Sequence, residues 1–265
     1  KTSLLMILAG LETLSNGRIS LDSTDITSLD EDRLAALRRD LVGIVFQAFR
    51  LIPSLTALQN VAIPLELAGR DDADNTAKAA LHSVGLANRL SHLPDQMSGG
   101  EQQRVAIARA FAAKPEIVLC DEVTSALDVS VQAAVLDLLD ELKNQQGTTY
   151  IFVSHDLAVV KAISDRVAVL YQGRLCEIGP VNAVYEAPFH PYTDVLLGAV
   201  LEPDPDIAPI LSADDVVELS PPAQGCCFQR RCPRKLGEIC DKETPPVREL
   251  ANGHIICCHV PASDL

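Results

Sequence analysis

Residues 98–103 read Ser-Gly-Gly-Glu-Gln-Gln, a composition that suits an anion-binding turn at the start of a helix. The two glycines let the backbone approach a phosphate closely, and the Ser98 hydroxyl adds a hydrogen-bond donor. The first N–H groups of a helix have no partner within it, so they point toward a charge at its start. We therefore expect Ser98, Gly99, Gly100 and Glu101 to take part in a phosphate site.

A second set of chemical groups ends an apolar segment. Residues 116–122 read Glu-Ile-Val-Leu-Cys-Asp-Glu, so a run of aliphatic side chains leads into two carboxylates, Asp121 and Glu122. Carboxylate oxygens bind Mg²⁺, and a carboxylate can accept a proton from water. A buried strand that ends in both acids would deliver this chemistry to one edge of a sheet.

Other polar groups stand beside apolar runs. Lys1, Thr2 and Ser3 precede a leucine-rich segment, Gln47 follows the run over 41–46, and His155 comes soon after the run over 149–153. Taken alone, these could be a helix start, a polar strand cap and a structural histidine. Only their order along the chain favours a functional role over these structural ones.

Strand-like and helix-like segments that could position these groups alternate along the chain, which predicts an α/β fold. Apolar runs predict strands over 18–21, 41–46, 117–120, 149–153 and 166–171. Asp30 and Glu31 predict the start of a helix over 32–39, since acids favour the N-terminal end of the helix dipole. Two more helices are predicted between Gln47 and Ser98, over 56–69 and 75–85.

In this order, the segments resemble the motifs of ATP-binding-cassette (ABC) ATPases, over residues 1–200. Residues 96–106 resemble the signature motif, 116–122 the Walker B strand, and 1–9 the end of the Walker A loop with its helix. Gln47 matches the Q-loop, residues 125–128 the D-loop, and His155 the switch histidine. The resemblance implies a P-loop NTPase fold with a helical subdomain over about residues 50–113. The glycines of the Walker A loop do not occur in the sequence, and we expect truncation at the Walker A lysine, Lys1.

The resemblance also implies a role for each matching residue. ATP would be bound by Lys1, Thr2, Ser3, Gln47, Ser98, Gly99, Gly100, Glu101, Asp128 and His155. Mg²⁺ would be held through Thr2, Gln47 and Asp121, and catalysis would involve Glu122, His155 and Gln47. The signature residues would contact ATP bound to a second protomer, because they belong to the helical subdomain whereas Lys1 and Asp121 belong to the core sheet.

The parts of the chain before and after residue 123 resemble different groups of the family. Residues 1–122 are similar to lipoprotein-release and macrolide-exporter ATPases, notably over 42–61 and 93–104, whereas residues 124–261 are similar to oligopeptide and dipeptide importer ATPases, notably in 124–132 and 190–194. Val123 stands where the family usually has proline. The implied function is ATP hydrolysis for a peptide importer; a lipoprotein-release exporter and a non-hydrolytic regulatory or metal-binding fragment are the alternatives.

Composition agrees with a peripheral transport subunit. The 22 basic and 36 acidic residues give a formal charge of −14, and without a basic patch we expect no nucleic-acid partner. No apolar run approaches the ~18 residues that cross a bilayer, and we find no signal peptide. The resemblance implies three kinds of partner: a second ATPase subunit, permease subunits and a periplasmic or extracellular binding protein. It also implies a peripheral location at the cytoplasmic face of the plasma (inner) membrane.

Six of the eight cysteines fall in residues 226–258, without the short C-x-x-C pairs of zinc ribbons. An ATPase core implies the cytoplasm, where disulfides are rare, so clustered cysteines favour a metal. The segment resembles the cysteine module of peptide-importer ATPases, which implies a 4Fe–4S cluster on Cys226, Cys232, Cys240 and Cys258; zinc and no metal stay open. Cys227 and Cys257 would be spare, while Cys120 and Cys176, the latter expected after the last strand, would pack as apolar residues.

The expected organisation has four parts. They are an ATPase domain over 1–178, a helical extension over 179–201, a proline-rich linker over 202–224 and the cysteine module over 225–261. Residues 202–265 contain few large apolar side chains, so we expect this segment to lack a core of its own. We therefore expect it to need a bound metal that stabilises its fold.

Overall fold

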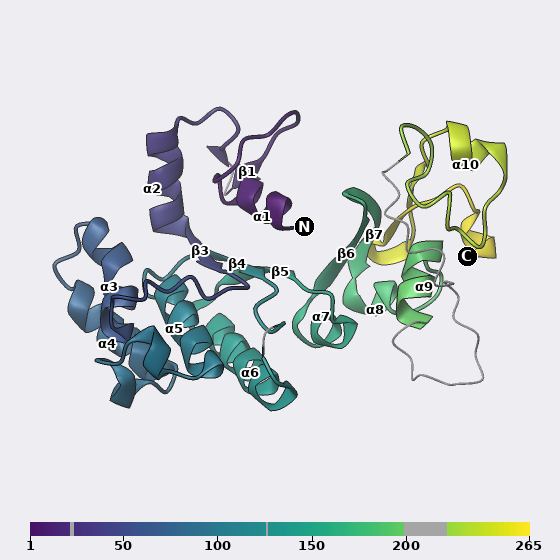
Figure 1. Ribbon diagram of the computed structural model, residues 1–265. Coiled ribbons are helices and arrows are strands. Elements are labelled where there is room, and N and C mark those ends of the chain that lie inside the picture. Colours follow the sequence, from purple (N-terminus) through teal and green to yellow (C-terminus); the bar gives the residue numbers. More distant parts are fainter. Residues whose placement is uncertain (22–23, 126, 199–221) are drawn as a thin grey trace. The chain divides into compact units, whose positions relative to one another are not determined.

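The computed structural model describes residues 1–21, 24–125, 127–198 and 222–265, which form two compact units, Lys1–His155 and Asp156–Leu265 (Figure 1). The first unit is built on a parallel sheet in the order β3-β4-β5. Its strands are Val42–Val45, Ile117–Asp121 and Thr149–Val153. Cys120 pairs with Val45 and Phe152, and Asp121 pairs with Val153, so the carboxyl ends of all three strands meet at one edge.

The central strand of this sheet is buried from Val118 to Asp121. Val118, Leu119 and Cys120 of β4 are at most 2% exposed, as the run of aliphatic residues predicts, and Cys120 packs as an apolar side chain. Helix α1 (Thr2–Leu8) packs through Leu5 against Leu119. Helix α6 (Val129–Gln146) lies beside β5, because the Tyr150 hydroxyl donates to the Leu139 carbonyl at 2.6 Å.

The predicted helix over 32–39 is confirmed as α2 (Glu31–Leu41). The Asp30 side chain accepts from the Arg33 N–H at its start, which satisfies a free donor of the first turn. Near its end, Arg38 donates to the Gly10 carbonyl at 2.6 Å and ties α2 to the end of α1. The strands β1 (Ser20–Leu21) and β2 (Thr24–Asp25) form a short antiparallel pair.

Every element between residues 50 and 113, a stretch that the structure describes throughout, is helical. The elements are α3 (Ala57–Leu67), α4 (Ala73–Ser83), η1 (Ala87–Arg89), η2 (Pro94–Gln96) and α5 (Gly99–Phe111). The two helices predicted before Ser98 are therefore confirmed as α3 and α4. They contact each other and α5 through buried aliphatic side chains, among them Val61 and Leu81.

The second unit contains an antiparallel sheet in the order β6-β7-β9-β8. Its elements are α7 (Leu157–Ile163), β6 (Arg166–Tyr171), β7 (Arg174–Pro180), α8 (Val181–Val184), α9 (Pro191–Gly198), α10 (Glu238–Lys242), β8 (Val247–Glu249), η4 (Ala251–Gly253), β9 (Ile255–Cys257) and η5 (Ala262–Asp264). Cys176 lies within β7, so the prediction that it follows the last strand was wrong. Glycine, glutamate and proline in β7 weaken the sequence signal for a strand.

The cysteine-containing segment shares a core with the residues that precede it. Phe228 is 2% exposed and packs edge-on against Tyr171 of β6 and at a tilt against Tyr192 of α9, with ring centroids 5.1 and 5.3 Å apart. Val195, Cys226 and Cys240 belong to the same hydrophobic group. The expectation that residues 202–265 lack a core of their own was wrong, because Ile256, Cys258 and Val260 also form a buried group within the segment. The need for a bound metal stays a prediction. The predicted linker up to residue 221, and residues 199–201 of the predicted helical extension, lie outside the described residues.

A buried acid joins three segments of this unit. Glu177 of β7 is fully buried, and its Oε1 lies 2.7 Å from His254 Nε2. Its Oε2 accepts from the His190 N–H at 3.0 Å and from the Thr193 hydroxyl. Gly179 makes room for the histidine, since a Cβ there would lie 3.0 Å from His254 Cδ2. Burial raises the pKa of Glu177, and these three partners satisfy its oxygens.

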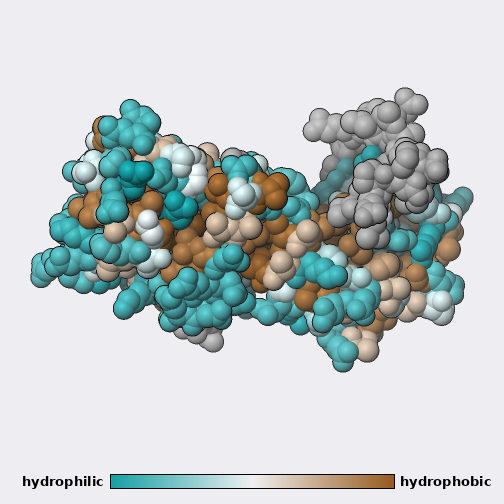
Figure 2. Space-filling view, turned by 90° about the horizontal axis from the view of Figure 1, so that it is seen from below, coloured by the Kyte–Doolittle hydropathy of each residue, from teal (hydrophilic) through white to brown (hydrophobic). Residues whose placement is uncertain are grey.

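Figure 2 shows that hydrophilic residues cover much of one face of the molecule. Among the described residues, no helix is both long and apolar enough to cross a membrane.

Candidate active site

Two predicted magnesium ligands contact each other at the edge of the parallel sheet. Thr2 begins α1 and donates from Oγ1 to Asp121 Oδ2, at 3.0 Å. Asp121 ends β4 and is 6% exposed. Lys1 precedes the helix and Ser3 lies in its first turn, both exposed. A hydroxyl and a carboxylate in contact form the kind of oxygen donor set that Mg²⁺ takes, so these residues fit the ion.

Glu122 follows β4 in a strained backbone conformation. Its φ is +48°, in the left-handed region that non-glycine residues seldom adopt. The conformation is held by its N–H, which donates to the Val153 carbonyl of β5 at 2.9 Å. Its Oε1 lies 3.4 Å from Nδ1 of His155, which follows the same strand β5. Such strain is concentrated at functional sites, and here it coincides with the predicted base.

Gln47 reaches the same group through an intermediate serine. Its Nε2 donates to Ser125 Oγ at 3.3 Å, and Ser125 Oγ donates to the Glu122 carbonyl at 2.9 Å. Ser125 was not among the predicted site residues, although it lies in the predicted D-loop, which was the available signal. The structure thus brings Thr2, Asp121, Glu122, Gln47 and His155 together from α1 and the ends of β3, β4 and β5.

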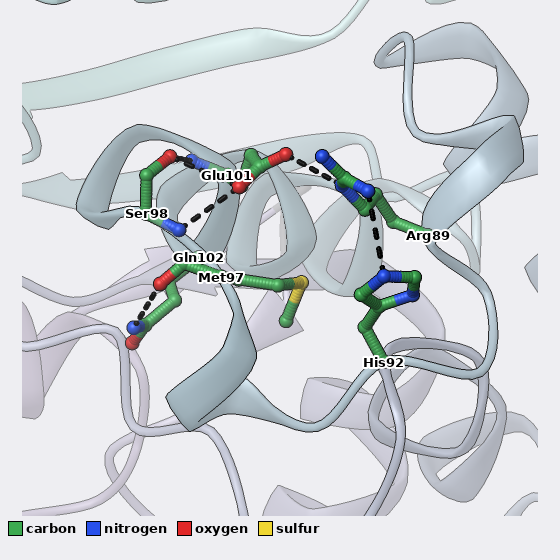
Figure 3. A network of polar contacts seen from close by, with 6 residues as sticks. All are labelled: Arg89, His92, Met97, Ser98, Glu101 and Gln102. Atoms are coloured by element: carbon green, nitrogen blue, oxygen red, sulfur yellow. Dashed lines mark hydrogen bonds and ion pairs between the residues drawn. The ribbon is translucent and has the colours of Figure 1, made fainter.

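The predicted signature residues begin α5 as a capping box (Figure 3). The Glu101 N–H donates to Ser98 Oγ at 3.3 Å, and Glu101 Oε2 accepts from the Ser98 N–H at 2.9 Å and hydroxyl at 3.1 Å. Arg89 Nε donates to Glu101 Oε1 at 2.8 Å, and its Nη1 lies 3.4 Å from His92 Nε2. The Arg89 hydrogen bond, with those from Ser98, lowers the pKa of Glu101 to about 2, so Glu101 is a carboxylate at neutral pH.

Gly100 and Asp128 both have a structural role at the first turn of α6. A Cβ on Gly100 would lie 2.7 Å from Val131 Cγ1 in the first turn of α6. Asp128 caps that helix, accepting from the Val131 N–H at 3.0 Å and the Ser130 hydroxyl at 2.8 Å. These bonds lower the pKa of Asp128. The nucleotide contact predicted for Asp128 stays a prediction, and its D-loop neighbour, residue 126, lies outside the described residues.

An arginine of α5 holds the chain that follows Gln47. Arg109 donates from Nη1 to the Arg50 carbonyl at 2.7 Å and from Nη2 to the Phe49 carbonyl at 2.9 Å. Arg50 itself has a φ of +47°, and its guanidinium lies 4.5 Å from the centre of the Phe46 ring. Sequence reasoning missed Arg109, and no sequence signal could have found it, since its partners are backbone carbonyls about sixty residues away.

The four cysteines predicted as cluster ligands share one neighbourhood. Burial, with the neighbouring thiols of Cys258, Cys226 and Cys240, raises the pKa of Cys232 to about 11. Cys226 and Cys240 are also joined by a backbone hydrogen bond of 2.8 Å. Within residues 1–21, 24–125, 127–198 and 222–265, no group of three or more Cys, His, Asp or Glu side chains is arranged around a single metal ion.

Comparison with known proteins identifies the family. A family model described as "ABC transporter" matches residues 1–125, and one described as "Oligopeptide/dipeptide transporter, C-terminal region" matches residues 176–240. The chain is 41% identical to a probable peptide ABC transporter ATP-binding protein of Sinorhizobium fredii, over 99% of this chain and 76% of that protein. It is 37% identical to the oligopeptide transport ATP-binding protein OppF of Salmonella typhimurium, over 97% and 80%.

A solved structure agrees with these relatives. It is a dimeric, post-hydrolysis ATP-binding cassette bound to ADP and Pi, with a TM-score of 0.63 and 36% sequence identity, over 69% of this chain and 81% of that one. The expected ABC ATPase fold is thereby confirmed. The chain belongs to the ATP-binding subunits of the ABC transporter family and is an ATPase.

Proposed function

We propose that this ATPase drives the import of peptides, as a peripheral subunit at the cytoplasmic face of the inner membrane. The observation that carries the proposal is the match of residues 176–240 to the C-terminal region of oligopeptide and dipeptide transporters, because these residues lie beyond every nucleotide motif. Permease subunits and a periplasmic binding protein would complete the transporter.

The site residues fit distinct roles in hydrolysis. Lys1, Thr2 and Ser3 would hold the phosphates, and Mg²⁺, held through Thr2, Gln47 and Asp121, would neutralise phosphate charge. Glu122 would orient the attacking water and accept its proton. His155, 3.4 Å from the Glu122 carboxylate, would position that group and contact the γ-phosphate. Gln47 would respond to the permease, because Ser125 connects it to Glu122.

Growth on peptides tests the transport role. A strain that lacks the gene and requires an amino acid should grow on a peptide containing it only when the wild-type gene is restored. The Glu122→Gln variant, made at the same level, should fail to restore growth, and the free amino acid should support every strain. Normal peptide growth without the gene, with lipoproteins retained in the inner membrane, would show a lipoprotein-release exporter instead.

A mixing experiment tests the shared site. We infer that Ser98, Gly99 and Gly100 contact the γ-phosphate bound by a second ATPase subunit. With the family's glycine-rich loop preceding Lys1, a Ser98→Arg protomer and a Lys1→Ala protomer should each be inactive. Mixed dimers should regain one of two sites, because an intact core then faces an intact signature. If labelled protomers exchange and the mixture stays inactive, the shared site is wrong.

We also propose a 4Fe–4S cluster on Cys226, Cys232, Cys240 and Cys258. The thiols of Cys226 and Cys240 both raise the pKa of Cys232 and of Cys258, which supports one neighbourhood for the four side chains. Four thiolates are the ligand set that such a cluster takes. Protein purified without oxygen should contain equal iron and sulfide and absorb near ~400 nm. Cys232→Ser should lose the absorbance and Cys257→Ser should keep it; zinc or no metal in the wild type would refute the cluster.

A further inference from the structure

Two cysteines outside the nucleotide site contact each other. Cys176 lies in β7, Cys227 lies in the C-terminal segment, and their Sγ atoms are 3.8 Å apart. Both thiols are free. Sulfurs in a disulfide are about 2.05 Å apart, so a relative shift of about 2 Å would bring these two to bonding distance.

The turn that presents Cys227 to β7 is held by its backbone. Gly225 has a φ of +80°, and a Cβ there would meet the Cys240 carbonyl oxygen at 2.4 Å, so no other residue fits without a shift. The Cys226 N–H donates to that same carbonyl at 2.8 Å. Arg174, two residues before Cys176 on β7, donates to the Gly225 carbonyl at 3.5 Å. The contact between the two thiols is therefore part of a fixed turn.

We propose that Cys176 and Cys227 form a disulfide when a low-molecular-mass disulfide such as oxidised glutathione is present. Cys227 is partly exposed, whereas Cys176 is 1% exposed, so Cys227 reacts first. Its thiol loses a proton, and the thiolate attacks glutathione disulfide to give a mixed disulfide and one glutathione thiolate. Cys176 then loses its proton and attacks the Cys227 sulfur, which releases the second glutathione. Two thiols are oxidised and one glutathione disulfide is reduced.

Cys226 is the competing partner, because its side chain also shares a hydrogen bond with the Cys227 thiol. A disulfide between adjacent residues closes a small ring through one peptide bond and forces that bond away from planar trans geometry. Cys176 carries no such constraint. Neither Cys176 nor Cys227 belongs to the four proposed cluster ligands, so the inference does not depend on a metal.

The test is peptide mapping of the oxidised protein. The full chain is incubated with oxidised glutathione, alkylated, digested without reduction and analysed by mass spectrometry. We expect one peptide pair joined through Cys176 and Cys227 and the loss of two thiols. Cys176→Ser should leave glutathione on Cys227, and Cys257→Ser, which alters a partly exposed cysteine of the same segment, should keep the cross-link. In the wild type, a glutathione adduct on Cys227 with Cys176 alkylated, or a Cys226–Cys227 bond, would overturn the proposal.

Discussion

His155 Nδ1 lies 3.4 Å from Glu122 Oε1, although the two residues follow different strands of the sheet. Glu122 follows β4 and His155 follows β5, and the bond from the Glu122 N–H to the Val153 carbonyl fixes the distance between them. The carboxylate and the imidazole can therefore act as a unit on one water molecule.

The first prediction concerns this unit. With the glycine-rich loop preceding Lys1, Glu122→Gln should keep ATP affinity and lose turnover by about 10²–10⁴-fold, because the amide cannot accept the proton of water. His155→Ala should also stall turnover with binding intact. Steady-state hydrolysis and equilibrium ATP binding measure the two effects. Glu116→Gln, at the exposed opposite end of the same strand, should behave as wild type. Near-normal turnover of Glu122→Gln would refute the assignment.

The second prediction concerns Arg109. Arg109→Gln should loosen the chain after Gln47, because it removes two charge-assisted hydrogen bonds to carbonyls, each worth about 1.5–3 kcal/mol. Amide hydrogen exchange over residues 46–52 should become faster, and turnover should fall. Arg70→Gln removes an arginine of the same unit that pairs with Asp72, and should leave that exchange unchanged. Equal exchange in both variants would contradict the role.

The third prediction concerns pH. The Glu101 carboxyl has a folded pKa of about 2, below its ordinary 4.5, so ionised Glu101 stabilises the fold above pH 4.5. That contribution is lost as the pH falls from 4.5 toward 2. Carboxyl ¹³C NMR should show a Glu101 midpoint near 2, and Arg89→Ala should raise it toward 4.5. An unshifted midpoint in Arg89→Ala would mean that Ser98 alone holds the carboxylate.

The fourth prediction concerns the space at Gly100. Gly100→Ala should lower stability by about 1–3 kcal/mol, because its Cβ would lie 2.7 Å from Val131 Cγ1. Adding Val131→Ala should recover part of the loss. Gly99→Ala is the matched control, since its nearest neighbour, Phe49 Cζ, would be 3.9 Å away. Thermal denaturation measures all three variants, and equal losses at both glycines would rule out the steric cause.

Local patterns were enough to predict strands in both units. The strands over 149–153 and 166–171 match β5 and β6 at both ends, because their apolar residues are continuous and polar residues bound them. Thr2 contacts Asp121 because parallel strands and the helix packed on them bring distant motifs to one edge, and the magnesium-binding role of both residues stays a prediction.

What could not be predicted depends on distant partners. β7 contains a buried glutamate whose partner, His254, lies 77 residues away, so no local pattern marks it as a strand. β8 and β9 are three residues each, too short for an alternating pattern to show. Cys227 was expected to be spare, yet it contacts Cys176, because only the folded turn at Gly225 brings it to β7.

The pairing of β9 with β7 also protects an edge of the antiparallel sheet. β9 covers the side of β7 that β6 does not, through Glu177 and Ile178, and β9 arrives only after residue 221. A chain that ends before residue 222 would expose the edge of β7. It would also leave the buried Glu177 without its partner His254. Unpaired edges are templates for pairing with other chains, so such a fragment should self-associate through its own sheet.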